Sequence, residues 1–206
     1  MTSKHPPPKR HRRESQSQTS DARERLVLAA YGLFCRYGVQ SVGIDLIIDE
    51  AGVAKTTRYR HFRSKDELVL AVLDLREQLW TREWLEEGVR RRARTPKTQL
   101  LAIFDLFHEW FQLDEYEGCL FTNTILETND LTSTVRAESE RRLANIHSFL
   151  RDLAKEAGIR RPDDFAHHWQ LLLLGAITAA STGDRQAARR GRAMATLFLE
   201  RELTKA

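Results

Sequence analysis

Apolar residues recur at helical spacing through nearly the whole chain from Asp21 onward, and glycines mark the points where the pattern stops. The first stripe ends before Gly38 and the second before Gly52, where a glycine readily adopts the left-handed conformation that closes a helix. The residues of the first stripe stand at i, i+4, i+7, i+8 and i+11: Leu26, Ala30, Leu33, Phe34 and Tyr37. Because no convincing run of period two remains, the sequence predicts an all-α protein of about nine helices.

One stretch fits either period. Ile44, Ile47, Ile48 and Ala51 form a helical face, whereas the alternate residues of 42–48 also fit a strand. Farther along, Ser64-Lys65-Asp66-Glu67 is a capping box that predicts the start of another helix. We therefore predict helices on both sides of the glycine at position 52, with a strand at 42–48 as the alternative.

The net charge of +4 is carried by residues 1–20, so the remaining chain is neutral overall. These 20 residues hold a proline run, a basic run and a Ser/Gln/Thr run, a composition that buries too little apolar surface to fold. We expect a disordered arm, either a solvated tail without a role or an arm that adds phosphate affinity. The whole chain, with 206 residues and 41% hydrophobic composition, is long enough for one large domain or two small ones.

Several classes of protein fit the composition poorly. The longest apolar run, Leu171–Ala180, is too short to span a membrane, and the polar N-terminus does not have the features of a secretory signal. The two cysteines, Cys35 and Cys119, are far apart in the sequence and indicate free thiols in a reducing compartment. We therefore expect a cytoplasmic protein with no membrane partner and no cofactor.

The residues around Gly52-Val53-Ala54 predict a helix-turn-helix, in which the helix after the turn enters the major groove of DNA. The segment from Lys55 to Lys65 contains five lysines and arginines and no acidic residue. Lysine and arginine pair with guanine edges or phosphates, and threonine and tyrosine hydroxyls donate to phosphates. Lys65 opposes the dipole of the helix that it begins, which favours a phosphate facing it.

The stretch AGVAKTTRYRHFRSKDELVLAVL, residues 51–73, resembles the N-terminal domain of tetracycline-repressor-like (TetR-family) regulators, and residues 22–80 as a whole follow that domain. EGCLFTNTILE at 117–127 is similar to a segment of the ligand-binding domain in one branch of the family. After the arm at 1–20, the resemblance implies a helix-turn-helix domain at 21–68 and a helical ligand-binding and dimerisation domain at 69–206. The predicted DNA-binding residues are Ser41, Lys55, Thr56, Thr57, Tyr59, Arg60, His61 and Lys65.

Two residues depart from the family pattern. Ile48 stands where the family often has alanine, and Arg58 stands where it has a core-facing aliphatic residue. A buried guanidinium without a partner is costly, so we expect Arg58 to lie along the edge of its helix. Its head group is then expected near Asp45, Asp49, Glu50 or a DNA phosphate.

The second part of the chain is expected to serve dimerisation and ligand sensing. The resemblance implies that the last two helices pair with their copies in a four-helix bundle; ordinary packing within one subunit is the alternative. The predicted dimer residues are Leu172, Gly175, Ala176, Ala179, Met194 and Phe198. Aromatic residues are core residues by default, but a cluster of them also suits an apolar pocket. The predicted pocket residues are Trp84, Phe104, Phe107, Trp110, Phe111, Phe121 and Trp169.

Competing functions have weaker support. No nucleophile–base pattern or phosphate-binding glycine loop indicates an enzyme, and the histidines include no H-x₃-H pair. His167 and His168 are adjacent on a helix, which favours one surface and one core residue over metal ligands, so no metal site is predicted. We predict a homodimeric, sequence-specific regulator of transcription, a repressor released from a palindromic operator by a small, largely apolar effector. The alternative is a helical partner-binding or thiol-sensing regulator with only non-specific affinity for double-stranded DNA.

Overall fold

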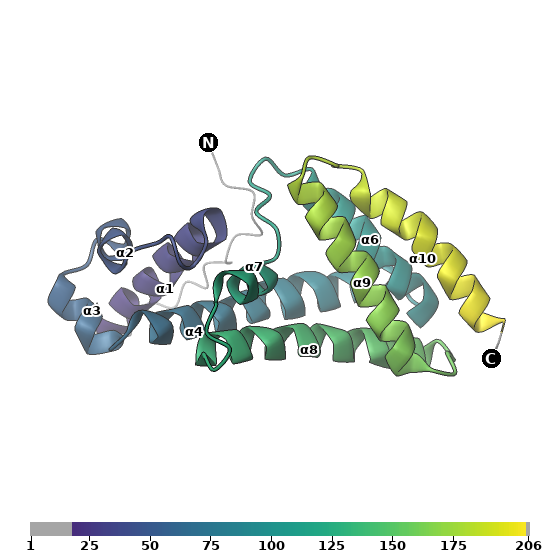
Figure 1. Cartoon of the computed structure of the whole chain (residues 1–206), viewed down its shortest axis with the longest axis horizontal. Helices are drawn as coiled ribbons and strands as arrows, with labels where there is room; N and C mark the ends of the chain where they lie inside the picture. The colour runs from purple at the N-terminus through teal and green to yellow at the C-terminus, as the bar shows by residue number, and fades with distance from the viewer. Residues whose placement is uncertain (1–17, 205–206) are drawn as a thin grey trace. The chain divides into compact units, whose positions relative to one another are not determined.

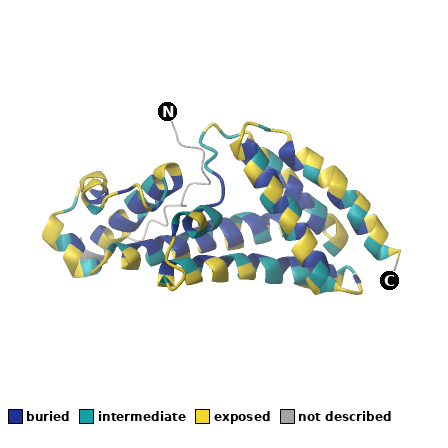
Figure 2. Ribbon diagram, in the orientation of Figure 1, coloured by how far each residue is buried: buried dark blue, intermediate teal, exposed yellow. Residues whose placement is uncertain are grey.

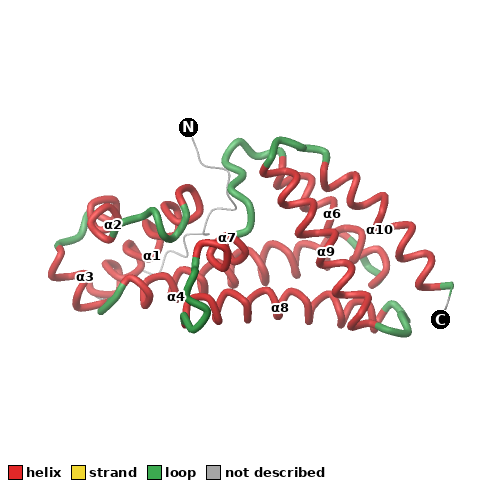
Figure 3. The backbone as a smooth tube through the Cα atoms, viewed as in Figure 1, coloured by secondary structure: helices red, strands yellow, loops and turns green. Residues whose placement is uncertain are grey.

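The computed structural model describes residues 18–204, in which every regular element is helical (Figure 1, Figure 3). In chain order the elements are α1 (Gln18–Tyr37), α2 (Ile44–Ala51), α3 (Lys55–His61), α4 (Lys65–Arg76), η1 (Glu77–Glu86), α5 (Glu87–Arg92), α6 (Pro96–Phe111), α7 (Leu120–Glu127), α8 (Thr134–Glu156), α9 (Pro162–Ser181) and α10 (Ala187–Leu203). Because α4, η1 and α5 run on without a break, residues 18–204 form nine separate helical segments. The all-α prediction is confirmed.

The predicted arm of residues 1–20 lies mostly outside the described residues. Within them, α1 begins at Gln18, three residues before the predicted start at Asp21. Asp21 lies in the first turn, where its negative charge is favourable at the positive end of the helix dipole.

One compact unit consists of residues 18–78 and Cys119–Arg142. In it, α1 packs against α2 and α4. The residues at the centre of its core have no exposed surface: Leu26, Ala30, Ile47, Leu68 and Val72. The ambiguous stretch is helical from Ile44, since Ile47 and Ile48 are both buried whereas Leu46 is exposed. That pattern of burial follows a helix and not an alternating strand.

The other compact unit consists of Leu79–Gly118 and residues 143–204. Here α10 packs against both α6 and α9. A Cβ atom at Gly191 would lie 2.9 Å from the ring of Phe104, so the absence of a side chain on α10 permits the close approach of α6. Trp169 on α9 is fully buried, and its ring contacts Phe104 and Phe165 at centroid distances of 5.6 and 5.0 Å.

The continuous helix formed by α4, η1 and α5 is π-helical from Glu77 to Glu86. The wider π-helical turn is uncommon and usually lasts a single turn. This stretch carries Trp80 and Trp84, whose ring centroids are 5.0 Å apart. The sequence pattern predicted a helix here without its π-helical geometry.

The units differ from the predicted domain division. The boundary predicted after Leu68 falls inside α4, and the first unit also includes residues 119–142, which the sequence assigned to the second domain. We keep the division into DNA-binding and effector-binding parts as a functional proposal. Within residues 18–204, no helix combines the length and apolar character needed to cross a bilayer.

Candidate nucleic-acid interface

The turn between α2 and α3 is built around Gly52. Its φ of 61° is left-handed, and its N–H donates to the carbonyl of Asp49 at 3.1 Å, while that of Val53 donates to the carbonyl of Ile48 at 3.3 Å. These bonds close the end of α2. Arg25 on α1 donates from Nη1 to the carbonyls of both Ala51 and Gly52, each at 3.3 Å. Hydrogen bonds from Arg25 therefore also join the predicted turn to α1.

The predicted DNA-binding residues of α3 divide by exposure (Figure 2). Lys55, Thr56, Tyr59 and Arg60 are exposed, with Tyr59 at 55%. Thr57 and His61 are half-buried, and His61 Nε2 is buried without a hydrogen-bond partner among the described residues. Ser41 is exposed in the loop before α2. The face that α3 presents to solvent therefore combines two cations with hydroxyl groups.

Lys55 is held by a carboxylate. Its Nζ lies 3.0 Å from Oδ1 of Asp45 in the first turn of α2. The hydrogen bond and charge of Asp45 raise the pKa of the Lys55 amine. Lys55 thus stays cationic, and Asp45 fixes its direction before any DNA is bound.

Lys65 has a different environment from the one predicted. It is half-buried, and its Nζ lies 3.5 Å from the carbonyl oxygen of Gln40. Burial lowers the pKa of the Lys65 amine, although the charges of Asp66 and Glu127 oppose this shift. The amine thus has a long internal contact, and its predicted contact with a phosphate stays a prediction. The capping box itself is confirmed, because Ser64 Oγ accepts from the N–H of Glu67 at 3.1 Å.

Arg58 does not lie along the helix edge as expected. It is only 5% exposed, and its guanidinium carbon lies 4.5 Å from the ring centroid of Tyr59. It makes no ion pair with any described carboxylate, and its buried Nε has no hydrogen-bond partner among the described residues. The expectation failed because the helical register directs position 58 into the core, whatever residue stands there. Arg58 packs beneath the exposed Tyr59.

Replacing Arg58 by leucine should raise the free energy of unfolding by about 1 kcal/mol. The change removes a buried unpaired N–H, worth about 1–3 kcal/mol, and loses a cation–π contact of about 0.5–1 kcal/mol. Chemical denaturation measures the difference. The exposed neighbour provides the control, since Arg60→Leu should change the stability by less than about 0.5 kcal/mol. A less stable Arg58→Leu protein would show that the guanidinium is well accommodated.

A carboxylate on α7 contacts the loop between α1 and α2. Glu127, the last residue of α7, accepts from the N–H of Gln40 at 3.0 Å. The carboxylate lies against Gly38, where φ is 82° and a Cβ atom would come within 2.4 Å of Oε1. Sequence reasoning missed this link, because nothing local to Glu127 indicates a partner 87 residues away.

The predicted pocket residues are brought together only in part. Trp84, Phe107 and Trp110 are in mutual ring contact, and Phe111 adjoins Phe107 and Trp110 at 5.7–5.8 Å. Phe104 and Trp169 form a separate pair, and Phe121 lies on α7 in the other unit. All of them except the half-buried Trp84 are buried. A cavity of about 340 Å³ lies elsewhere, lined among others by Arg160, Arg161, Phe165, Phe198 and Arg201.

The predicted dimer residues are not all exposed. Gly175 and Met194 are exposed, Leu172, Ala179 and Phe198 are half-buried, and Ala176 is buried in its own chain. Phe198 stacks on Phe165 at a centroid distance of 5.0 Å. Sequence reasoning missed two large exposed apolar residues on the same helices, Leu171 at 70% and Leu197 at 65%. The helical spacing of Met194 and Leu197 is the signal that would have indicated them.

Both thiols are free and buried. Cys119 is only 5% exposed and packs as a small hydrophobic residue. Cys35 and Cys119 belong to the same unit. Burial limits the access of oxidants to either sulfur, which weighs against the thiol-sensing alternative.

Comparisons with known proteins address the helix-turn-helix directly. The model of the family described as bacterial regulatory proteins, tetR family, matches residues 26–72. The chain is 31% identical over 135 residues to the transcriptional activator FasR of Mycolicibacterium smegmatis, covering 63% of this chain and 59% of that protein. It is 27% identical over 127 residues to an uncharacterised HTH-type regulator of Lactococcus lactis, of which 64% is covered. The chain thus spans less than two thirds of the length of either relative.

Solved structures extend the similarity to most of the chain. A TetR-family regulator from Streptomyces coelicolor superimposes with a TM-score of 0.82 at 27% identity, covering 89% of this chain and 96% of that one. A putative TetR-type regulator from Streptomyces avermitilis has a TM-score of 0.72 at 29% identity, covering 83% and 90%. These regulators share both the helix-turn-helix and the arrangement of the later helices with this chain. Residues 26–72 thus match the DNA-binding part of the TetR family, and most of the chain shares its fold with TetR-family regulators of transcription.

Proposed function

We propose that the protein regulates transcription by reading a specific DNA site with α3. The observation that carries this proposal is the solvent-exposed face of α3, on which Lys55, Thr56, Tyr59 and Arg60 stand together directly after the Gly52 turn. In this motif the second helix enters the major groove with its first residues against the base edges. The match of residues 26–72 to the tetR-family model and the names of the relatives support the same proposal.

The exposed side chains suit different parts of the DNA. Arg60 has the planar fork that pairs with O6 and N7 of guanine, and within residues 18–204 no carboxylate holds it as Asp45 holds Lys55. Thr56 and Tyr59 offer hydroxyls to phosphates, which set the register of the helix on the duplex. We assign base recognition mainly to Arg60 and positioning mainly to the hydroxyl groups.

The functional form is a homodimer built from α9 and α10. Leu171 on α9, and Met194 and Leu197 on α10, are 60–70% exposed in the single chain, which is unusual for large apolar residues on neighbouring helices. Gly175 follows Leu171 one turn along α9 and leaves room for a helix of the second copy. A two-fold dimer places its two α3 helices about 34–36 Å apart on a palindromic site.

Replacing Leu197 by glutamate should convert the dimer to a monomer. The change puts a charge into the apolar face that the second copy covers, which costs more than the contact can supply. Sedimentation velocity at micromolar concentration measures the result. Leu131→Glu is the matched control, because Leu131 is 78% exposed but lies before α8, outside this face. Wild-type protein that sediments as a monomer would refute the dimer.

We assign the effector response to the helical part after residue 69, with a largely apolar ligand. The contact between the aromatic rings of Trp84 and Trp110 supplies an apolar environment for such a ligand. Phe121 lies near the start of α7 and Glu127 at its end, where Glu127 holds the loop before α2. A ligand that shifts α7 therefore displaces that loop, provided that it prefers the shifted state.

We propose repression as the direction of regulation, because a dimer on an operator excludes other proteins from that DNA. The relative from M. smegmatis is named an activator, so the direction needs its own experiment. Transcription of a reporter from a promoter that contains the bound site should fall when the protein is expressed. A rise in transcription would make the protein an activator. Titration of apolar compounds against tryptophan fluorescence should give a saturable change with the effector.

A further inference from the structure

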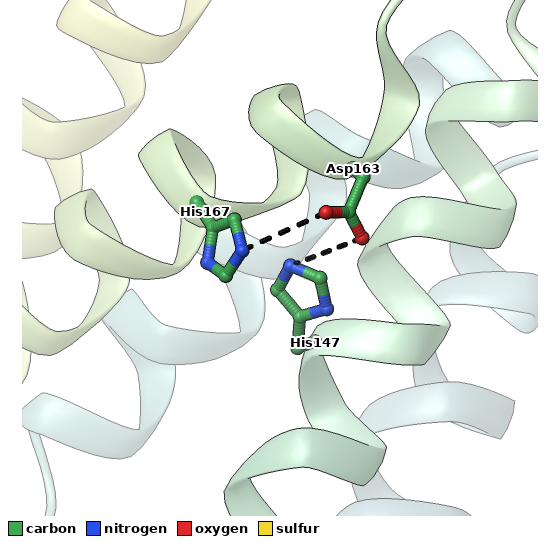
Figure 4. A group of neighbouring side chains, drawn as sticks. All are labelled: His147, Asp163 and His167. Atoms are coloured by element: carbon green, nitrogen blue, oxygen red, sulfur yellow. Dashed lines mark ion pairs between the residues drawn. The ribbon is translucent and has the colours of Figure 1, made fainter.

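Three side chains that could hold a metal ion converge where α8 meets the start of α9 (Figure 4). His147 comes from α8, whereas Asp163 and His167 stand one turn apart on α9. Their ligating atoms all lie within 4.8 Å of one another. His147 Nε2 is 3.9 Å from Oδ1 of Asp163, and His167 Nε2 is 3.7 Å from Oδ2. Figure 4 shows both rings directed toward the carboxylate.

The three groups do not satisfy one another. Both nitrogen–oxygen distances exceed the length of a hydrogen bond, and the ring centroids of the two histidines are only 4.2 Å apart. His147 has a side-chain exposure of 14%, and its Nε2 is buried with no hydrogen-bond partner among the described residues. A polar atom in that situation is costly unless something else binds it.

The dimensions suit a transition-metal ion. Zinc binds imidazole nitrogen and carboxylate oxygen at about 2.0–2.2 Å in tetrahedral geometry, which places two ligand atoms about 3.3–3.5 Å apart. Closing the observed 3.7 and 3.9 Å separations requires only small rotations of Asp163 and His167, whose side chains are 63% and 66% exposed. Two imidazoles and one carboxylate favour zinc, nickel or copper over magnesium or calcium.

We propose that His147, Asp163 and His167 form a binding site for a divalent transition metal such as zinc. The three protein ligands leave one tetrahedral position for water, and the exposed side lets the ion exchange with solvent. The bound ion joins α8 to α9 across the turn at residues 157–161. Because α9 also carries Leu171 of the proposed dimer face, an occupied site stiffens the helix pair beneath that face.

Sequence reasoning missed this site because it looked for two histidines one turn apart. The local pair is instead Asp163-x₃-His167, and the third ligand is 16 residues earlier in the chain on another helix. His168 was considered with His167, but its Nδ1 lies 2.7 Å from the carbonyl of Asp164, and its ring lies near Phe198. Both histidines are exposed, so the expectation of one core residue is wrong.

The proposal is tested by calorimetric titration of the untagged, chelator-treated full chain with zinc chloride. We expect one saturable site per chain. His147→Gln and His167→Gln should each weaken zinc binding at least ~10-fold, the lower end of the effect of altering even an outer partner of a metal ligand. His168→Gln is the matched control and should bind like the wild type. Zinc should also raise the melting temperature of wild type and His168→Gln, but not of His167→Gln.

Several outcomes would overturn the proposal. Absence of saturable zinc binding in the wild type would do so at once. Binding that survives both His147→Gln and His167→Gln would place the ion elsewhere, for example at His5 or His11 near the N-terminus. Equal weakening by His168→Gln would indicate loose attraction to the histidine-rich surface. Since His167 is exposed, its substitution leaves the fold intact, which circular dichroism verifies.

Discussion

Replacing Arg142 by alanine should lower the free energy of unfolding by about 3–5 kcal/mol, as expected when one partner of a buried ion pair is removed. The Arg142 side chain on α8 is 3% exposed and its Nε lies 2.9 Å from Oε2 of Glu77, itself 10% exposed. It also contacts Asp74 and, at 3.4 Å, Glu138. Without the guanidinium, the buried carboxyl group of Glu77 loses this ion pair. Urea denaturation monitored by circular dichroism measures the change.

The neighbouring arginine supplies a matched control for this prediction. Arg141 is exposed, and its guanidinium donates to Glu138 within a single helix. Arg141→Ala should therefore change the stability by less than about 1 kcal/mol. Arg142→Met, which keeps much of the volume without the charge, should still destabilise because Glu77 stays buried. A loss below about 1 kcal/mol in Arg142→Ala would mean that water or rearranged partners compensate for the missing charge.

Replacing Arg60 by alanine should weaken binding to the preferred DNA site by about 10–100-fold, which corresponds to about 1–3 kcal/mol for one bidentate base contact. Arg60 is exposed on α3 and makes no ion pair with a carboxylate of residues 18–204, unlike Lys55. Fluorescence anisotropy with labelled duplex measures the affinity. The same titration with unrelated DNA separates base recognition from phosphate attraction.

The affinities of Arg60→Ala for the preferred site and for unrelated DNA decide whether Arg60 contacts a base or a phosphate. A base contact lowers the affinity for the preferred site much more than that for unrelated DNA, whereas a phosphate contact lowers both alike and reduces the salt dependence. Arg141→Ala, an exposed arginine on α8, is the control and should leave both affinities unchanged. Equal losses on both duplexes in Arg60→Ala would contradict the assignment of base recognition to Arg60.

The features that depend on neighbours in sequence were predictable. Helical period, the left-handed glycine at position 52 and the capping box at Ser64 are set within a few residues of one another, and each is found in the structure. The residues that α3 exposes follow from the same period, with the exception of Arg58. The charge of Arg58 led us to expect an exposed side chain. The helical register of α3 instead directs the side chain into the core.

The features that depend on distant contacts could not be predicted. The carboxylate of Glu127 lies against Gln40, and the Lys65 amine near the same loop is half-buried as a result of the fold. His147 meets Asp163 only because the chain turns back between α8 and α9. Such contacts join segments whose local patterns contain no sign of each other. These contacts bring the Glu127 carboxylate to the loop before α2, and they form the candidate metal site in the other compact unit.

The central claim, that α3 of a two-fold dimer reads a specific sequence, is tested most directly by selecting bound DNA from a random library at near-physiological salt. We predict enrichment of a palindrome whose half-sites are centred about 34–36 Å apart, or a multiple of one helical turn. Arg60→Ala protein should enrich a site with relaxed preference at one position of each half. Retention of DNA without a motif, lost steeply as salt rises, would show phosphate attraction alone and contradict the account.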